Sequence, residues 1–154
     1  MQIPADDAPL DELCQFIVLR HHAYLHRALP VIEAQLARVP GAEVRDAFAD
    51  LAGQLHSHLA KEENLLFPAI EALARADRQG SGRPALPFSM VLYPIRLMET
   101  EHARIEAAIA HLRVLTHGLG VTELTRLEED VHEHHRAENE VLFPRALELE
   151  QRLS

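Results

Sequence analysis

Apolar residues recur at alternating spacings of three and four along four stretches of the chain. This spacing places them on one face of an α-helix and is typical of helices that pack around a common core. Proline and glycine interrupt the pattern near residues 40–41, 79–84 and 118–120, as they do at turns. The pattern therefore predicts helices over residues 10–38, 42–78, 87–117 and 122–151.

The connections between these stretches are short, which places consecutive helices side by side and antiparallel. With 154 residues, the chain has the length of one ordinary domain. We therefore expect an all-α protein, an up-down-up-down antiparallel four-helix bundle formed as a single domain over residues 1–154. Within it, the expected apolar seams include Val18 and Cys14 in the first helix, Leu65 in the second and Val141 in the fourth.

Six positions in these seams are polar: His22, His58, Glu62, His102, His134 and Glu138. A carboxylate inside a bundle is unfavourable unless it is paired or bound to a cation. The four histidines also lie at similar distances from the turns that separate them, for example 18 residues on either side of residue 40. In an antiparallel bundle, equal distances from a turn mean equal height, so we expect the six side chains in one layer.

A repeated motif supports this layer. His58 to Pro68 and His134 to Pro144 both read H-x3-E-x4-F-P. A spacing of four stacks histidine and glutamate on one helix face, and a proline inside a helix is expected to kink it. Four imidazoles and two carboxylates exceed the ligand set of one tetrahedral zinc and suit a pair of iron or manganese ions, with the carboxylates as bridges and two histidines on each ion.

Composition and charge exclude several classes of protein. A formal net charge of −9 disfavours binding to nucleic acid or to an anionic membrane. The single cysteine, Cys14, cannot form an internal disulfide, and we interpret it as a core residue. No apolar run is long enough to span a bilayer, and the acidic N-terminus does not resemble a signal peptide, so we expect a soluble, cytoplasmic protein.

Seven further histidines lie outside this set. His21 is the alternative to His22 as a ligand, and we place His26 at the edge of a pocket. We expect surface positions for the others: His56, His111, His117, His132 and His135. We interpret Glu63 and Glu106 as exposed charges. The alternative is that they accept a hydrogen bond from the N–H of a metal-ligating residue.

With these residues in view, the chain resembles the hemerythrin-like, or HHE cation-binding, family from Arg20 to Arg145. Within that family it is most similar to the branch that repairs iron centres after nitrosative and oxidative stress, without that branch's N-terminal cysteine-containing domain. The shared strings include Glu101-His102 and the run from Glu138 to Ala146. The resemblance implies the same six ligands, two oxo- or hydroxo-bridged non-haem iron ions, and less readily manganese or zinc.

The function that the resemblance implies is binding of, or reaction with, nitric oxide or dioxygen, with electrons from a separate donor or with an iron–sulfur protein as partner. Glu106 replaces the second histidine of an H-x3-H motif, and Glu138 replaces an aspartate, which disfavours a reversible oxygen carrier. Two alternatives stay open: a sensor or store of gas or iron without turnover, and a ferritin-like oxidase that uses the Glu99/His102 and Glu129/His132 pairs. We expect apolar side chains to line the access path: Leu25, Leu55, Ile105 and Val141.

Overall fold

The computed structural model describes residues 2–154, which form four long helices and no strand. Three of these helices contain a short π-helical segment. The first helix comprises α1 (Leu10–Ile17), η1 (Val18–His22) and α2 (Ala23–Leu36), and the second comprises α3 (Ala42–Lys61), η2 (Glu62–Leu66) and α4 (Phe67–Gln79). The third is α5 (Leu92–Leu115), and the fourth comprises α6 (Glu123–Arg136), η3 (Ala137–Leu142) and α7 (Phe143–Leu153).

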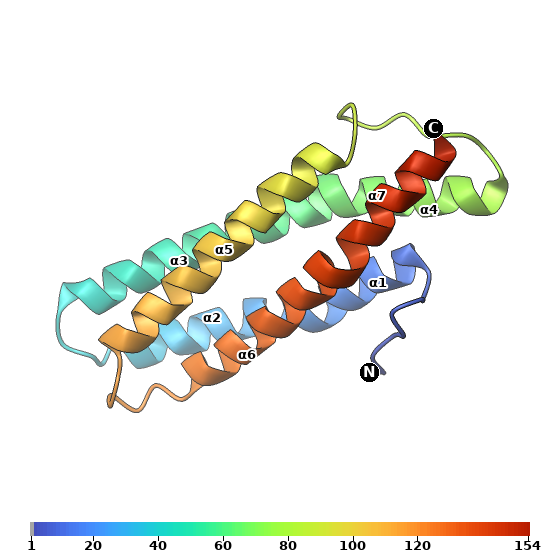
Figure 1. The fold of residues 1–154 in the computed structure, drawn as a ribbon. Coiled ribbons are helices and arrows are strands. Elements are labelled where there is room, and N and C mark those ends of the chain that lie inside the picture. The colour runs from blue at the N-terminus through green and yellow to red at the C-terminus, as the bar shows by residue number, and fades with distance from the viewer. Residues whose placement is uncertain (1) are drawn as a thin grey trace.

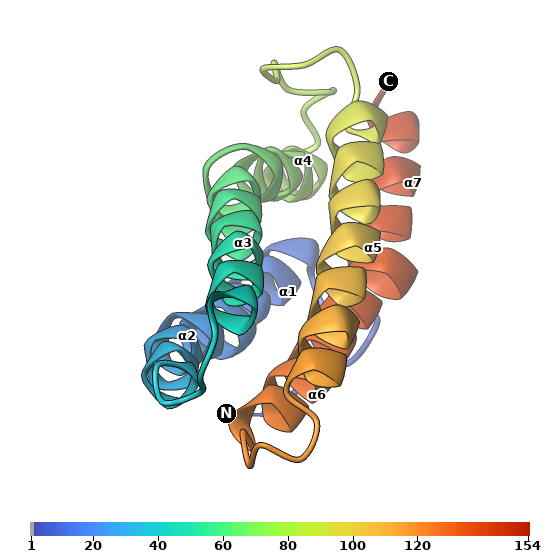
Figure 2. The same ribbon diagram turned by 90° about the vertical axis from the view of Figure 1, so that its left-hand side faces the viewer.

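The four helices run alternately up and down around a common centre (Figures 1 and 2). Short connections join the first helix to the second and the third to the fourth at one end of the molecule, and the longer connection over residues 80–91 lies at the other end (Figure 1). This arrangement confirms the antiparallel four-helix bundle that the apolar pattern predicts.

The third helix begins later than expected, at Leu92 rather than near residue 87. The buried carboxylate of Glu150 in α7 accepts the backbone N–H of Val91 at 3.2 Å and a hydrogen bond from Arg83 at 3.0 Å. It therefore satisfies a free donor at the helix start and fixes where α5 begins. None of the helices described is both long and apolar enough to cross a membrane.

The apolar core consists of two clusters, one toward each end of the bundle. The first contains Leu51, Leu55 and Val131, and the second contains Phe67, Ile70 and Phe143. Cys14 is fully buried in the second cluster, as expected of a core residue. Burial, followed by the charge of nearby carboxylates, raises the pKa of its thiol. The polar layer predicted from the sequence lies between the two clusters.

The π segments explain where the predicted apolar seams are wrong. Leu65 is 51% exposed, whereas Leu66 is 1% exposed. In the fourth helix, Val141 is only half-buried and Leu142 is fully buried. A π-helical turn contains one residue more than an α-helical turn, so the seam moves forward by one position. In the first helix, Val18 in η1 is half-buried, and the buried seam position is the preceding residue, Ile17.

The prolines of the repeated motif each lie two residues after the end of a π segment. Pro68 and Pro144 each occupy the first turn of the α-helix that follows, α4 and α7. A proline lacks the N–H that would bond to the carbonyl four residues earlier and clashes with that carbonyl. For Pro68 and Pro144 that carbonyl belongs to a residue of η2 or η3. The irregularity predicted at the prolines therefore takes the form of a wider turn just before each of them.

Candidate metal centre

The polar layer brings together all six residues singled out from the sequence, each at most 1% exposed. They come from all four helices, and three of them lie in π segments: His22 in η1, Glu62 in η2 and Glu138 in η3. The other three belong to α-helices: His58 to α3, His102 to α5 and His134 to α6. The layer is a compact set of nitrogen and oxygen donors, enclosed by apolar side chains on both sides.

The histidines form two pairs. The Nε2 atoms of His22 and His134 lie 3.2 Å apart, and those of His58 and His102 lie 3.1 Å apart. Each pair forms, with both glutamates, a group of four ligand atoms within 4.8 Å of one another. We call the group with His22 and His134 the first position and the group with His58 and His102 the second position.

Glu62 directs one carboxylate oxygen to each position. Its Oε2 lies 3.0 Å from Nε2 of His22 and 3.6 Å from Nε2 of His134. Its Oε1 lies 2.9 Å from Nε2 of His58 and 3.5 Å from Nε2 of His102. A carboxylate in this orientation is placed to bridge two ions.

Glu138 is divided in the same way between the two positions. Its Oε1 lies 3.0 Å from Nε2 of His102, and its Oε2 lies 3.3 Å from Nε2 of His134. Both of its oxygens are buried without a hydrogen-bond partner, as is Oε1 of Glu62. Buried carboxylate oxygens without donors are unfavourable unless a cation satisfies them.

The electrostatics of the layer favour positive charge. Burial opposes protonation of His102 and His134, but the adjacent carboxylates of Glu138 and Glu62 outweigh it and raise the two pKa values to about 9 and about 10. Burial likewise opposes ionisation of Glu62, yet hydrogen bonds from the surrounding histidines hold its pKa well below the usual value. Four imidazoles and two carboxylates therefore fit two divalent cations in donor type, number and charge.

Comparison with known proteins agrees with this arrangement. A family model described as "Hemerythrin HHE cation binding domain" matches residues 16–85. The chain is 32% identical over 164 residues to "Iron-sulfur cluster repair protein YtfE" of Edwardsiella ictaluri, an alignment that covers 91% of this chain and 67% of that protein. It is also 32% identical over 161 residues to "Iron-sulfur cluster repair protein DnrN" of Neisseria gonorrhoeae, covering 92% of this chain and 94% of that one. The chain belongs to the hemerythrin HHE cation-binding family.

In this hemerythrin-like protein, three of the four site histidines have a partner on the ring nitrogen that faces away from the centre. Nδ1 of His22 lies 2.8 Å from Oε1 of Glu63, and Nδ1 of His58 lies 3.0 Å from Oε1 of Glu101. Nδ1 of His102 lies 2.9 Å from Oδ1 of Asn139. An acceptor at Nδ1 keeps the proton there and leaves Nε2 free to bind a metal.

The sequence reasoning missed two of these three partners and interpreted Glu63 wrongly as an exposed charge. A signal was present, because each partner is adjacent in sequence to a site residue of its own helix: Glu63 to Glu62, Glu101 to His102 and Asn139 to Glu138. Each reaches a histidine on a neighbouring helix. Glu101 also pairs with Lys61. Burial alone would raise the pKa of the Glu101 carboxyl, but hydrogen bonds from Lys61 and His58 outweigh burial and lower this pKa.

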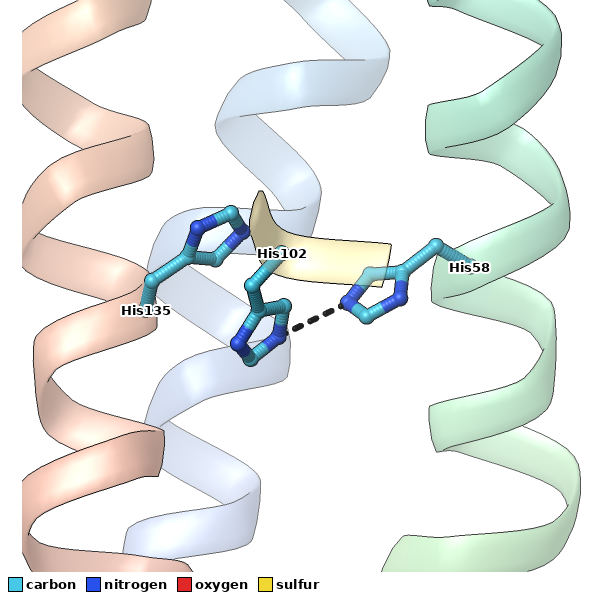
Figure 3. Close-up of side chains that lie close together, drawn as sticks. All are labelled: His58, His102 and His135. Atoms are coloured by element: carbon cyan, nitrogen blue, oxygen red, sulfur yellow. Dashed lines mark hydrogen bonds between the residues drawn. The ribbon is translucent and has the colours of Figure 1, made fainter. Parts of the chain in front are cut away.

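His135 corrects another expectation. Predicted at the surface, it is 3% exposed, and its ring stacks on that of His102 with the centroids 3.8 Å apart. Figure 3 shows the rings of His58, His102 and His135 projecting into the same space from three helices. Neighbouring residues on a helix are about 100° apart, so the layer must be wide enough to take both His134 and His135. Burial, and then the nearby histidines, lower the pKa of His135.

The remaining histidines divide as follows. His21 is buried and its Nδ1 bonds to Oδ1 of Asp130 at 2.9 Å, but His22 and not His21 belongs to a group of converging ligand atoms. His26 is exposed and stacks on His56. The expectation of surface positions is confirmed for four histidines: His56, His111, His117 and His132.

Other expectations are resolved by the packing. Glu129 and His132 are exposed, so the ferritin-like ligand set is not assembled. Of the residues expected to line an access path, Ile105 borders a groove of about 460 Å³ between α3 and α5, beside Lys61 and Glu101. Ile105 also belongs to the first apolar cluster, as do Leu25 and Leu55, and Val141 packs against the second cluster.

Proposed function

We propose that this protein is a non-haem di-iron protein that binds or reacts with nitric oxide or dioxygen, in defence against nitrosative and oxidative stress or in the repair of iron centres. The observation that carries the proposal is the division of each buried carboxylate between the two histidine pairs. An arrangement with one ion would not need the oxygens of Glu62 and Glu138 to face opposite pairs. Because all four helices contribute to the layer, we also propose that the chain acts as one domain.

Two ferrous ions would supply the electrons and the open coordination positions that a diatomic gas requires. Residues of the protein would bind the ions, balance their charge and fix the histidine rings. The Nε2 atoms of the four histidines would hold the ions, while Glu62 and Glu138 would span the two positions and balance the charge of the ions. Glu63, Glu101 and Asn139 hold the protons on Nδ1 and fix three of the rings. The apolar clusters on both sides keep water away from the layer.

A second candidate function is donation of iron to damaged clusters. It is favoured by the names of the relatives, which are iron–sulfur cluster repair proteins. In that case the partner is an apo iron–sulfur protein rather than a gas, and one or both irons must leave the site readily. A sensor would instead form a stable, reversible gas adduct and would not consume the gas.

The proposal is tested by metal analysis of protein purified without oxygen, followed by optical spectra on addition of nitric oxide or dioxygen. We expect two irons per chain, and absorption changes on exposure to the gas. Consumption of gas in the presence of a reductant identifies an enzyme, and transfer of iron to an apo acceptor identifies a donor. One zinc per chain, or a stable fold that binds no metal, would refute the proposal.

A further inference from the structure

The four site histidines differ in the hydrogen-bond partner of Nδ1, the ring nitrogen that faces away from the centre. The Nδ1 atoms of His58 and His102, which make up the second position, both have an acceptor: Glu101 at 3.0 Å and Asn139 at 2.9 Å. In the first position only His22 has one, Glu63 at 2.8 Å. Nδ1 of His134 is buried without a partner. Such an acceptor fixes the orientation of the ring and raises its basicity, so loss of the acceptor typically lowers metal affinity by about 10- to 100-fold.

Each position also has an additional histidine beside it, and these two differ as well. His21 stacks on His134 of the first position at a centroid distance of 5.3 Å, and its Nδ1 is bonded to Asp130. His135 stacks on His102 of the second position, and neither of its ring nitrogens has a hydrogen-bond partner. The nearest carboxylate oxygen, Oε2 of Glu106, lies 3.6 Å from Nδ1 of His135, which is too far for a hydrogen bond.

His135 is therefore a free nitrogen donor next to the second position. A ring nitrogen of His135 lies within 4.8 Å of one ring nitrogen of His58 and of one ring nitrogen of His102 (Figure 3). The planes of the His135 and His102 rings are 13° from parallel, so the nitrogen lone pairs of the two rings lie in separate, nearly parallel planes. His135 must tilt out of the stack before both can bind one ion. His135 is therefore an additional donor at the second position, whereas His21 belongs to no group of ligand atoms at the first position.

We propose that the two metal positions are unequal, so that the ion held by His58 and His102 is retained while the ion held by His22 and His134 is exchangeable. The two glutamates do not create this difference, since each gives one oxygen to each position. It comes from the missing acceptor behind His134 and from the additional donor His135. The inference rests on the proposed two-metal site and states which of its ions leaves first.

The test is the release of Fe²⁺ from the loaded protein to an excess of a chromophoric ferrous chelator, without oxygen. We expect two phases of one iron each, with rates that differ by about tenfold or more. His22→Ala and His58→Ala form a matched pair, because each removes one histidine from one position and leaves both glutamates. The iron retained by His22→Ala should leave slowly, and the iron retained by His58→Ala should leave rapidly.

Two further sets of variants keep the test decisive if an alanine variant fails to fold. Glu101→Leu removes the acceptor of His58 and should accelerate only the slow phase, and Glu63→Leu removes the acceptor of His22 and should accelerate only the fast phase. His135→Phe keeps an aromatic ring on His102 but removes the donor, so it should accelerate the slow phase as His135→Ala does, while the exposed control His132→Ala changes neither phase. A slow phase that is normal in His135→Phe would show that His135 only supports the ring of His102.

The outcomes separate this inference from the proposed function. Failure of the wild-type protein to bind two irons refutes the proposed function. Binding of two irons that leave at one rate, or in the opposite order in the matched pair, overturns the inference and leaves the proposed function standing.

Discussion

Replacing both bridging carboxylates by amides is the most direct challenge to the proposed centre. Glu62 and Glu138 are fully buried, and glutamine keeps their size while removing two negative charges. With neutral histidines, the layer carries two negative charges in the wild-type protein and none in the Glu62→Gln/Glu138→Gln variant. Two divalent ions would then be buried without any anionic ligand from the protein.

The size of the effect follows from the charges. Two unit charges about 4 Å apart interact by about 4 kcal/mol at an effective dielectric constant near 20. Each ion loses contact with two carboxylates, so a loss of at least that size is expected, and about 4 kcal/mol corresponds to roughly a thousandfold weaker binding. The double variant should therefore fall from two ions per chain to none after desalting.

The assay combines metal analysis with thermal unfolding. Iron at about 100 times its dissociation constant adds about 2.7 kcal/mol to the stability of the folded state. For a chain of this length, that raises the Tm of the wild-type protein by roughly 5–10 °C. The double variant should fold, because the exchange is nearly isosteric, and should show almost no rise in Tm on addition of iron.

A matched control changes two glutamates of the fourth helix that point to solvent. Glu133 and Glu140 are 63% and 66% exposed, so Glu133→Gln/Glu140→Gln should keep both ions and the full rise in Tm. If the Glu62→Gln/Glu138→Gln variant held two ions per chain with unchanged affinity, the assignment of these carboxylates as bridges would be wrong.

Three further predictions follow from the structure. In metal-free protein, His102 and His134 hold their protons more tightly in the folded than in the unfolded state, which stabilises the fold. This contribution is fully present below about pH 6.5 and should be lost as the pH rises through about 9 to 10. Denaturant unfolding at several pH values measures it. Leu66→Ala should lower the free energy of unfolding by about 2–5 kcal/mol, and the same change at the exposed Leu65 by about 0.5 kcal/mol or less. Glu150→Leu should destabilise the protein by about 1–3 kcal/mol, because the N–H of Val91 loses its acceptor, and amide exchange should speed up at the start of α5.

Each of these has a result that contradicts it. Stability of the metal-free protein that stays level from pH 7 to 10 would show that the carboxylates do not hold protons on the two histidines. Equal losses at Leu65 and Leu66 would contradict the register set by the π segment. Unchanged exchange at the start of α5 would show that Glu150 does not determine where that helix begins.

The sequence alone was sufficient for the bundle and for the membership of the polar layer. Helix formation and the three–four spacing of apolar residues are local properties, so they can be read along the chain. The six polar seam positions stood out because a buried histidine or glutamate conflicts with that spacing, and the H-x3-E-x4-F-P repeat fixed their order. The structure places all six in one layer, while their role as ligands rests on the proposed function.

The tertiary structure decided the finer arrangement. The α-helical period could not reveal the π turns, so Leu65 was assigned to the core in place of Leu66. The burial of His135 and the partners of the Nδ1 atoms depend on side chains from other helices, such as Asn139 reaching His102. Which oxygen of Glu62 faces which histidine pair depends on the packing of all four helices at once. Local periodicity determines which residues face the interior, but only packing determines what each of them meets there.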